Sequence, residues 1–246
     1  MRCVCRRIAA CSILAWAVAG YATPSTQIWI PSTDVQPFLS PHLGWDVYLN
    51  AFGGGLVSNG GVTIGVLPAK KIGLEVGIDY RDISGDHLDP LYFNAKCGVP
   101  EGAFFPHMPA IAVGGYDFGT KKNVTTYNIL YGLIAKNIWK AGRLSVGAYK
   151  GAVGADAGAL FAAASEPEKI DDVGLLVSWD RTLAEISDKL WTAIDFQSGR
   201  SGYGAVSFGF AWNFAPNAGV IVGYNVYLDR EAIKPTVTIQ WDANLW

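Results

Sequence analysis

The sequence predicts an all-β chain that closes into an antiparallel, up-and-down transmembrane β-barrel of about twelve strands. Three observations support this prediction. Apolar residues alternate with small or polar ones, and mean hydropathy is high although no long apolar run occurs. Short connections between the predicted strands alternate with longer ones. Half of the 246 residues are apolar and mean hydropathy is +0.22. After residue 22, however, no apolar run reaches the ~18 residues of a membrane helix.

The alternation is clearest in residues 72–81. The even-numbered residues there are apolar, whereas the odd-numbered ones are glycine or charged. A period of two places successive side chains on opposite faces of a strand. The pattern recurs along the chain, and no helical segment is available to cover the apolar faces. A closed barrel satisfies all these strands at once, with lipid outside and polar side chains inside.

The first 22 residues are predicted to be a signal peptide. Three arginines precede an apolar stretch at 8–18, and small residues allow cleavage after Ala19 or Ala22. Three of the four cysteines leave with this peptide, so Cys97 alone remains and no internal disulfide forms. The mature chain keeps 16 basic against 21 acidic residues and has no basic patch. We therefore expect no nucleic-acid partner.

Residues 23–42 form a separate proline-rich segment, because four prolines interrupt it and proline cannot donate to a sheet ladder. Two placements are open: a periplasmic tail, or a piece that folds back into the lumen, with Ile28, Trp29 and Ile30 as an apolar anchor. The barrel itself is predicted at 43–246. Its strands are expected near 43–53, 61–67, 71–82, 91–98, 109–118, 124–136, 143–152, 172–182, 189–197, 203–214, 218–228 and 235–245.

The connections support an orientation. The short or moderate ones, at 68–71, 136–142 and 215–217, fall at every second junction, as periplasmic turns do in such barrels. An even strand number then leaves both chain ends in the periplasm. The glycines at 53–55 and at 60–61 are interpreted as hairpin and bulge residues.

Aromatic residues near the strand ends predict two interfacial girdles. Tryptophans gather toward the periplasmic ends and tyrosines toward the outer ends. The predicted girdle residues are Trp45, Trp139, Trp179, Trp191, Trp212, Trp241, Tyr80, Tyr92, Tyr116, Tyr127, Tyr149 and Tyr203.

The signal peptide, the amphipathic strands and the C-terminal Trp246 together resemble a small, monomeric bacterial outer-membrane β-barrel protein. The resemblance implies an outer-membrane location, contact with the lipid bilayer, and assembly by the barrel-assembly machinery, which in that family reads a last strand ending in an aromatic residue. Val237, Ile239 and Trp241 alternate as that pattern requires, whereas Trp246 has the opposite parity. The resemblance covers nearly the whole mature chain and identifies no subfamily.

Strand parity also predicts which residues face the lumen. They line an aqueous path, grip a polar solute, or simply fill the interior as compensated charges. The predicted lumen residues are Glu75, Asp79, Arg81, Ser178, Asp180, Asp195, Gln197, Asn225 and Tyr227. The strand at 203–214 is different, because its inner face consists of alanine, serine and glycine and leaves room for a solute or for residues 23–42.

Enzymatic chemistry has little support. His87 lies beside Asp86, Asp89 and Ser84 in an outer loop, which is the only arrangement suggestive of a hydrolase. His42 has no evident partner. We expect no catalytic residues, no metal site and no cofactor.

The leading functional prediction is a narrow diffusion path or binding lumen for small solutes of unknown identity. The alternative is a non-conducting structural or surface-interaction barrel that acts through its outer loops, and a membrane-embedded hydrolase is third. The remaining fold alternative is a soluble β-sandwich, which would dissolve without detergent.

Overall fold

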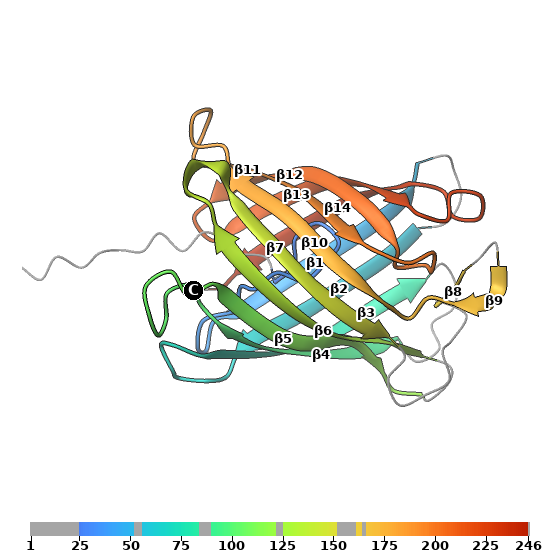
Figure 1. Cartoon of the computed structure of the whole chain (residues 1–246), viewed down its shortest axis with the longest axis horizontal. Coiled ribbons are helices and arrows are strands. Elements are labelled where there is room, and N and C mark those ends of the chain that lie inside the picture. The colour runs from blue at the N-terminus through green and yellow to red at the C-terminus, as the bar shows by residue number, and fades with distance from the viewer. Residues whose placement is uncertain are drawn as a thin grey trace, which may run out of the picture.

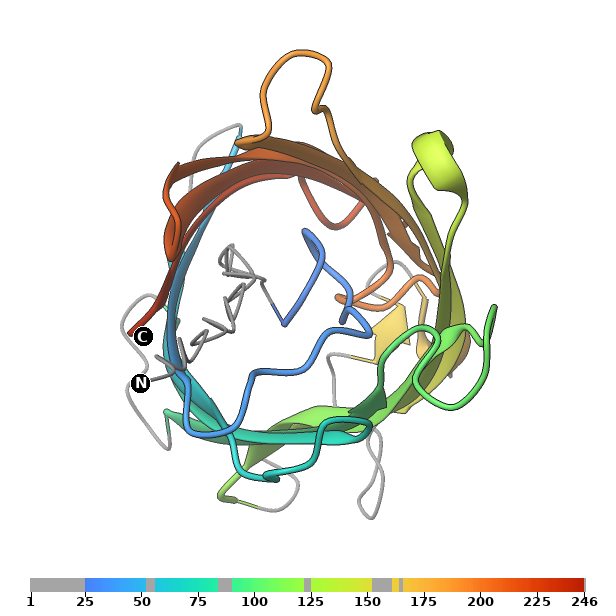
Figure 2. The ribbon, with the colours of Figure 1, turned by 90° about the vertical axis from the view of Figure 1, so that its left-hand side faces the viewer.

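The barrel is seen in a computed structural model that describes residues 25–51, 56–83, 90–121, 125–151, 161–163 and 166–245. Twelve strands of this described part close into one barrel (Figures 1 and 2). They are β1 (Pro41–Asn50), β2 (Leu56–Gly65), β3 (Gly73–Ile83), β4 (Leu91–Val99), β5 (Ala110–Gly119), β6 (Thr126–Asn137), β7 (Arg143–Gly151), β10 (Val173–Thr182), β11 (Leu190–Gln197), β12 (Ala205–Ala215), β13 (Ala218–Tyr227) and β14 (Thr236–Asn244).

The topology is up-and-down. Each strand pairs antiparallel with its neighbours in the chain, and β1 closes the barrel by pairing with β14. The strands β8 (Ala162–Ala163) and β9 (Glu166–Ile170) form a separate small hairpin in the loop between β7 and β10, so those two barrel strands pair directly. The predicted class, a closed antiparallel barrel of about twelve strands, is confirmed.

Helical structure is limited to one 3-10 turn, Trp139–Ala141, among the residues that the structure describes. None of the helices found in those residues has the length and apolar character needed to cross a membrane.

The two ends of the barrel differ. His42 pairs with Asn244, so the first and last strands meet at one end, which we call the terminal end. The connections 66–72, 100–109, 138–142, 183–189 and 216–217 lie at this end. The opposite loop end carries the longest connection, 152–172, which includes β8 and β9 (Figure 1). The predicted signal peptide at 1–22, the glycines at 53–55, the loop around His87 and the terminal Trp246 lie outside the described residues.

The start of β2 was wrongly predicted. The expected strand was 61–67, but β2 runs from Leu56 to Gly65, and its pairing with β1 and β3 continues through Gly60 and Gly61 without a register shift. The glycine pair is therefore not a turn. Gly61 lies under the side chain of Asp79, whose Oδ1 would be 2.0 Å from a Cβ at this position. The residue is glycine because an inward carboxylate occupies the space.

The outer face of the barrel is apolar. Large apolar side chains that would be buried in a soluble protein are exposed around its middle, as the alternation predicts for a lipid-facing surface. Examples are Val76, Ile78, Phe93, Val113, Ile134, Val146, Val177, Ile194, Phe208 and Phe210, all between 37% and 58% exposed. The inner residues that alternate with them are buried and mostly small or polar.

The lumen holds the N-terminal segment. Residues 25–40, drawn in blue, run inside the ring of strands before β1 begins at Pro41 (Figure 2). Residues 25–32 of this segment form a tight hairpin, which we call the lumen hairpin. The N–H of Gln27 donates to the carbonyl of Ile30 at 2.7 Å, and the N–H of Ser32 donates to the carbonyl of Ser25 at 3.1 Å.

A charge on the lipid face should unfold the barrel more readily than a charge in a turn. Val146 is 58% exposed near the middle of β7, so Val146→Arg should lower the free energy of unfolding in lipid vesicles by about 2–4 kcal/mol. The matched control is Ile186→Arg, because Ile186 is 71% exposed in the turn after β10. Urea titration of both refolded variants measures the difference. Equal losses would contradict the assignment of the lipid-facing surface.

The turn after β4 makes a pH-dependent contribution to the free energy of unfolding. A hydrogen bond from Lys136 at 2.6 Å, together with bonds from Asn137, lowers the pKa of Glu101 from its ordinary value of 4.5 to about 2. Since the folded pKa is the lower one, this stabilisation is complete above about pH 4.5 and is lost as pH falls toward 2. Glu101→Gln should therefore cost about 1 kcal/mol at neutral pH and nothing near pH 2.

Urea titrations between those pH values measure this difference. Glu231→Gln, an exposed loop residue, serves as control. A cost for Glu101→Gln that does not depend on pH would contradict the ion-pair explanation.

Candidate functional site

The lumen hairpin divides the barrel interior into two cavities. The β1–β4 cavity, of about 710 Å³, is lined by inner residues of β1 to β4 and by Trp29 of the hairpin. It extends from His42 and Asp242 at the terminal end to Asn50 and Lys234 at the loop end. A second, terminal-end cavity of about 950 Å³ lies beneath the hairpin, between β7, β10, β11 and β13. The first cavity therefore follows nearly the full length of β1.

The hairpin is anchored by one buried carboxylate. The backbone N–H groups of Ile28, Trp29 and Ile30 all donate to Oδ2 of Asp195, at 2.9, 2.8 and 3.3 Å. Asp195 lies on the inner face of β11 and is 1% exposed. Three successive amides that converge on one oxygen form a concave anion site, here closed by a residue of the same chain. The turn of the hairpin is thus held by charge-assisted hydrogen bonds.

Two ion-pair groups hold the flanks of the segment. Arg143 of β7 donates to both carboxylate oxygens of Asp34 at 2.8 Å and to Asp180 at 2.9 Å, and Gln27 also donates to Asp180. On the other side, Lys96 pairs with Glu75 at 3.1 Å.

The second group also reaches the backbone of the segment. Lys96 donates to the carbonyl of Ser25 at 2.8 Å, and Glu75 accepts the N–H of Gln36 at 2.7 Å. Because buried charges are stable only when compensated, these pairs fix both the segment and the strands around it.

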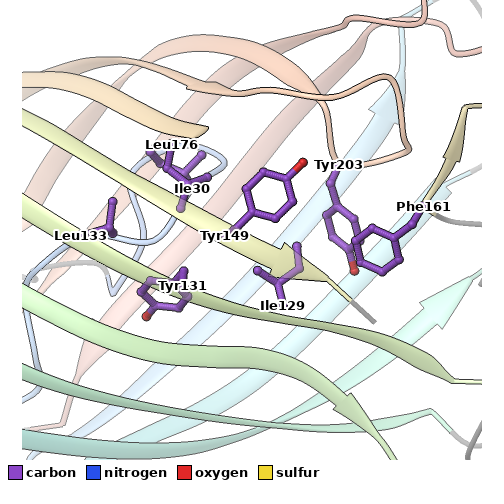
Figure 3. Close-up of a cluster of buried hydrophobic side chains, with 8 residues drawn as sticks. All are labelled: Ile30, Ile129, Tyr131, Leu133, Tyr149, Phe161, Leu176 and Tyr203. Carbon is purple, nitrogen blue, oxygen red and sulfur yellow. The ribbon is translucent and has the colours of Figure 1, made fainter. Parts of the chain in front are cut away.

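Apolar packing completes the attachment. Ile28 is buried against Ala193, Ala211 and Ile221, where the small inner residues of β12 leave room for it. Ile30 joins a larger cluster with Leu133 and Leu176 that continues through the tyrosines toward the loop end (Figure 3). The smooth inner wall expected at 203–214 is present, and the hairpin occupies it.

The cluster that contains Ile30 also fills one side of the lumen at the loop end. Phe161, from the long loop before β8, is fully buried and stacks on Tyr203 at 5.2 Å between ring centroids (Figure 3). Gly151 lies directly beneath it, since a Cβ there would be 2.1 Å from the Phe161 ring. The β5–β7 side of the lumen is therefore filled, whereas the β1–β3 side retains the cavity.

The structure places all nine predicted lumen residues on the inner side of the barrel, but it does not bring them to one site. Glu75, Asp79, Arg81 and Tyr227 line the β1–β4 cavity, and Asp180 lines the terminal-end cavity. The other four are buried between the wall and the lumen contents and line neither of these cavities: Ser178, Asp195, Gln197 and Asn225.

Half of the predicted girdle is wrong. Trp45, Trp139, Trp212, Trp241 and Tyr80 are 41–88% exposed, and Trp179 also lies on the outer face. Trp45 and Trp241 contact each other across β1 and β14, with ring centroids 5.4 Å apart. Six residues instead face inward: Trp191, Tyr92, Tyr116, Tyr127, Tyr149 and Tyr203.

The error has a simple cause, because the girdle prediction used height along the strand and ignored the face. Trp191 shares the parity of Asp195, and its indole N–H donates to Asp180 at 3.2 Å. Tyr149 shares the parity of the buried Ser145. The inward rings fill the lumen instead of marking a membrane interface.

Several site residues were missed. Asp46, Lys96 and Arg143 alternate correctly with outward neighbours, so strand parity alone would have found them. Asp117 has no such signal. It sits at a bulge in β5 with φ of 59°, which lets both Tyr116 and Asp117 face inward, and it pairs with Arg81.

His42 does have partners. Its two ring nitrogens lie 3.1 Å from Oδ1 of Asp242 and 3.0 Å from Oδ1 of Asn244, at the terminal end of the β1–β14 seam. No group of three or more histidine, cysteine or acidic side chains suited to a metal ion occurs among the residues that are described.

Fold and site together define a closed transmembrane β-barrel whose N-terminal segment lies in its lumen. No family model and no curated protein matches the chain. Among solved structures, outer membrane phospholipase A from Escherichia coli is 10% identical, with a TM-score of 0.50 over 86% of this chain and 95% of that one. The KdgM porin is 8% identical (TM-score 0.49; 83% and 99% covered) and the NanC porin 7% identical (0.45; 83% and 100%). At such identities the likeness concerns the fold alone, and the predicted outer-membrane barrel fold is confirmed.

Removing the anchor carboxylate should release the lumen hairpin. Asp195→Asn keeps the side-chain volume but loses the charge that three N–H groups share, which is worth about 2–3 kcal/mol. Chymotrypsin should then cut after Trp29 at least about tenfold faster than in the unaltered barrel, since the cut rate follows the open population.

Asp188→Asn, an isosteric change at an exposed turn residue, is the control. The cut is followed by mass spectrometry of the refolded protein. An unchanged rate in Asp195→Asn would show that the carboxylate does not hold the hairpin.

Proposed function

We propose that the protein is an outer-membrane barrel that provides a narrow path for small solutes. The observation that carries this proposal is the β1–β4 cavity, which follows β1 from His42 near the terminal end to Asn50 at the loop end. Its volume of about 710 Å³ is in the range of small-molecule sites. The path is narrow because the lumen hairpin and the buried cluster around Tyr203 and Phe161 occupy much of the interior beside it.

The walls of the cavity support an aqueous path. Polar and charged side chains project into it from β1 to β4, among them Asp46, Asp79 and Arg81. Gly44 and Gly61 face it side by side on β1 and β2, so the backbone itself forms part of the wall. Water can solvate such a surface. A solute can therefore pass along it without separating apolar side chains that pack against each other.

The cellular setting belongs to the same proposal. The predicted signal peptide directs the chain across the inner membrane, and the barrel-assembly machinery inserts it as a monomer with the terminal end in the periplasm. The long loops then face outward. The confirmed fold and the apolar outer face support this arrangement.

The proposal includes no enzymatic activity. Both ring nitrogens of His42 are engaged by Asp242 and Asn244, and no hydrogen bond joins this histidine to a serine or cysteine within the described residues. The hydrolase alternative rests on Ser84 and His87, which are outside those residues.

The alternative function is a non-conducting barrel that acts through its outer loops. It is favoured by Phe161 and the aromatic cluster, which close the β5–β7 side of the loop end. Conductance separates the two functions, because only the first requires the β1–β4 cavity to be continuous with both solutions.

Filling the cavity should block conductance. The mature chain, refolded into a planar bilayer, should show discrete openings, and Gly44→Phe should remove or greatly reduce them. A Cβ at Gly44 meets nothing closer than 3.8 Å, so the ring enters open space in the lumen.

Gly60→Phe is the matched control, because Gly60 lies in the adjacent strand, has the same 3.8 Å clearance, and faces lipid. Barrel folding is checked by heat-modifiable migration on gels. Silence of the folded, unaltered protein would overturn the path and favour the surface-interaction barrel, as would equal conductance of both phenylalanine variants.

A further inference from the structure

The charges around the β1–β4 cavity do not balance. Three acidic residues of its wall have a basic partner: Glu75 pairs with Lys96, Asp117 with Arg81, and Asp242 with His42. Asp46 has neither an ion pair nor a hydrogen bond to any of the described residues, although it projects from the middle of β1 into the same cavity. One carboxylate of the cavity wall is therefore left without a direct partner among the described residues.

Polar groups next to Asp46 also lack hydrogen-bond partners among the described residues. Asn59 is its Cα partner on β2, and the side-chain oxygen of Asn59 is buried and accepts no hydrogen bond within the described part of the chain. Tyr48 lies two residues after Asp46 on β1, and its hydroxyl also has no hydrogen-bond partner among the described residues. Asp79, which lies over Gly61, receives one bond from Asn94 at 2.7 Å and forms no ion pair with the residues that the structure describes. Near the middle of β1 the wall thus offers two acceptors without a partner in the described part of the chain, the carboxylate of Asp46 and the side-chain oxygen of Asn59.

Aromatic rings border these acceptors on the loop-end side. Trp29, at the tip of the lumen hairpin, contacts Tyr48 and Tyr227 with ring centroids 5.6 and 5.7 Å apart and planes at 90° in both cases. All three rings line the β1–β4 cavity. Rings at right angles form a corner in which an alkyl group or a cation can contact an aromatic face.

We infer that this cavity binds a protonated amine, with Asp46 as its counter-ion. The N–H groups of the ammonium donate to the carboxylate of Asp46 and to the side-chain oxygen of Asn59, which satisfies both at once. The carbon chain of the amine then lies in the corner formed by Trp29, Tyr48 and Tyr227. Anions are disfavoured because the unpaired carboxylates repel them. This inference rests on the proposed function and specifies the class of solute for the same cavity.

The requirement for donors sets the choice of probe. A quaternary ammonium carries the same charge and satisfies an aromatic corner, but it has no N–H to give to Asp46 and Asn59. Comparing n-butylammonium with tetramethylammonium, which has the same number of carbon atoms, therefore separates hydrogen-bonded recognition from general attraction of cations.

Binding is tested by isothermal titration calorimetry on the mature chain refolded in detergent, at about pH 9, where an alkylamine still carries its proton. We expect n-butylammonium to bind more tightly than tetramethylammonium. Asp46→Asn should raise the Kd of n-butylammonium at least about tenfold, because a hydrogen bond to a charged group is lost. Glu231→Gln removes the same charge from an exposed loop residue and should leave the Kd unchanged.

A second variant covers the case in which Asp46→Asn fails to fold. Tyr48→Phe keeps the ring and removes only the hydroxyl, so it should weaken n-butylammonium binding severalfold. The inference is overturned if the folded, unaltered protein binds neither ammonium, if it binds both equally, or if Asp46→Asn and Glu231→Gln behave alike. Because calorimetry needs no current, binding without conductance would reject the solute path and keep the amine site, whereas conductance without binding would do the reverse.

Discussion

The interior of this barrel is organised around the carboxylate of Asp195, which accepts three successive backbone N–H groups from the turn of the lumen hairpin. A turn buried away from water must find partners for its amides, and the barrel wall supplies them with one charged oxygen. The position of Trp29 follows from this contact, and so do the burial of Ile28 and the reach of the segment to Glu75 and Arg143. Without the Asp195 contact, the ion pairs of Glu75 and Arg143 would still hold the flanks of the segment, but the turn of the hairpin would not be fixed in position.

The asymmetry of the lumen is a second consequence. The hairpin lies against β10 to β13, where inner residues are small, and the tyrosines with Phe161 fill the side of β5 to β7. Beneath the hairpin lies the terminal-end cavity, and on the other side the open space runs along β1 to β4. At Gly44 and Gly61 the wall of this space consists of backbone alone, because glycine has no side chain. Charged side chains project into the space from neighbouring positions. The shape of the open region is therefore determined by what packs on the opposite wall as much as by the residues that line it.

Much of the fold could be predicted from the sequence because its physical basis is local. Alternation with a period of two reports a strand and its faces, so twelve strands and the inward placement of residues such as Glu75 and Asp195 follow from parity. Contacts between distant segments leave no such trace. Nothing in the residues around Ile28 indicates that Asp195, more than 160 positions away, would receive their amides. The bulge at Asp117 changes the parity of β5 without a sequence signal, and the inward tyrosines resemble interfacial ones until their face is considered.

The lumen hairpin precedes β1 in the chain and is not a loop between two barrel strands. Its departure therefore breaks none of the twelve strand pairings, and its return needs no partner molecule. The short connection through Leu39 and Ser40 keeps a displaced hairpin close to its own binding site, at an effective concentration in the millimolar range typical of short tethers. A free peptide of the same sequence would have to be supplied at comparable concentration to compete. Reclosure is thus an intramolecular event, whose equilibrium does not depend on how much of the protein the membrane contains.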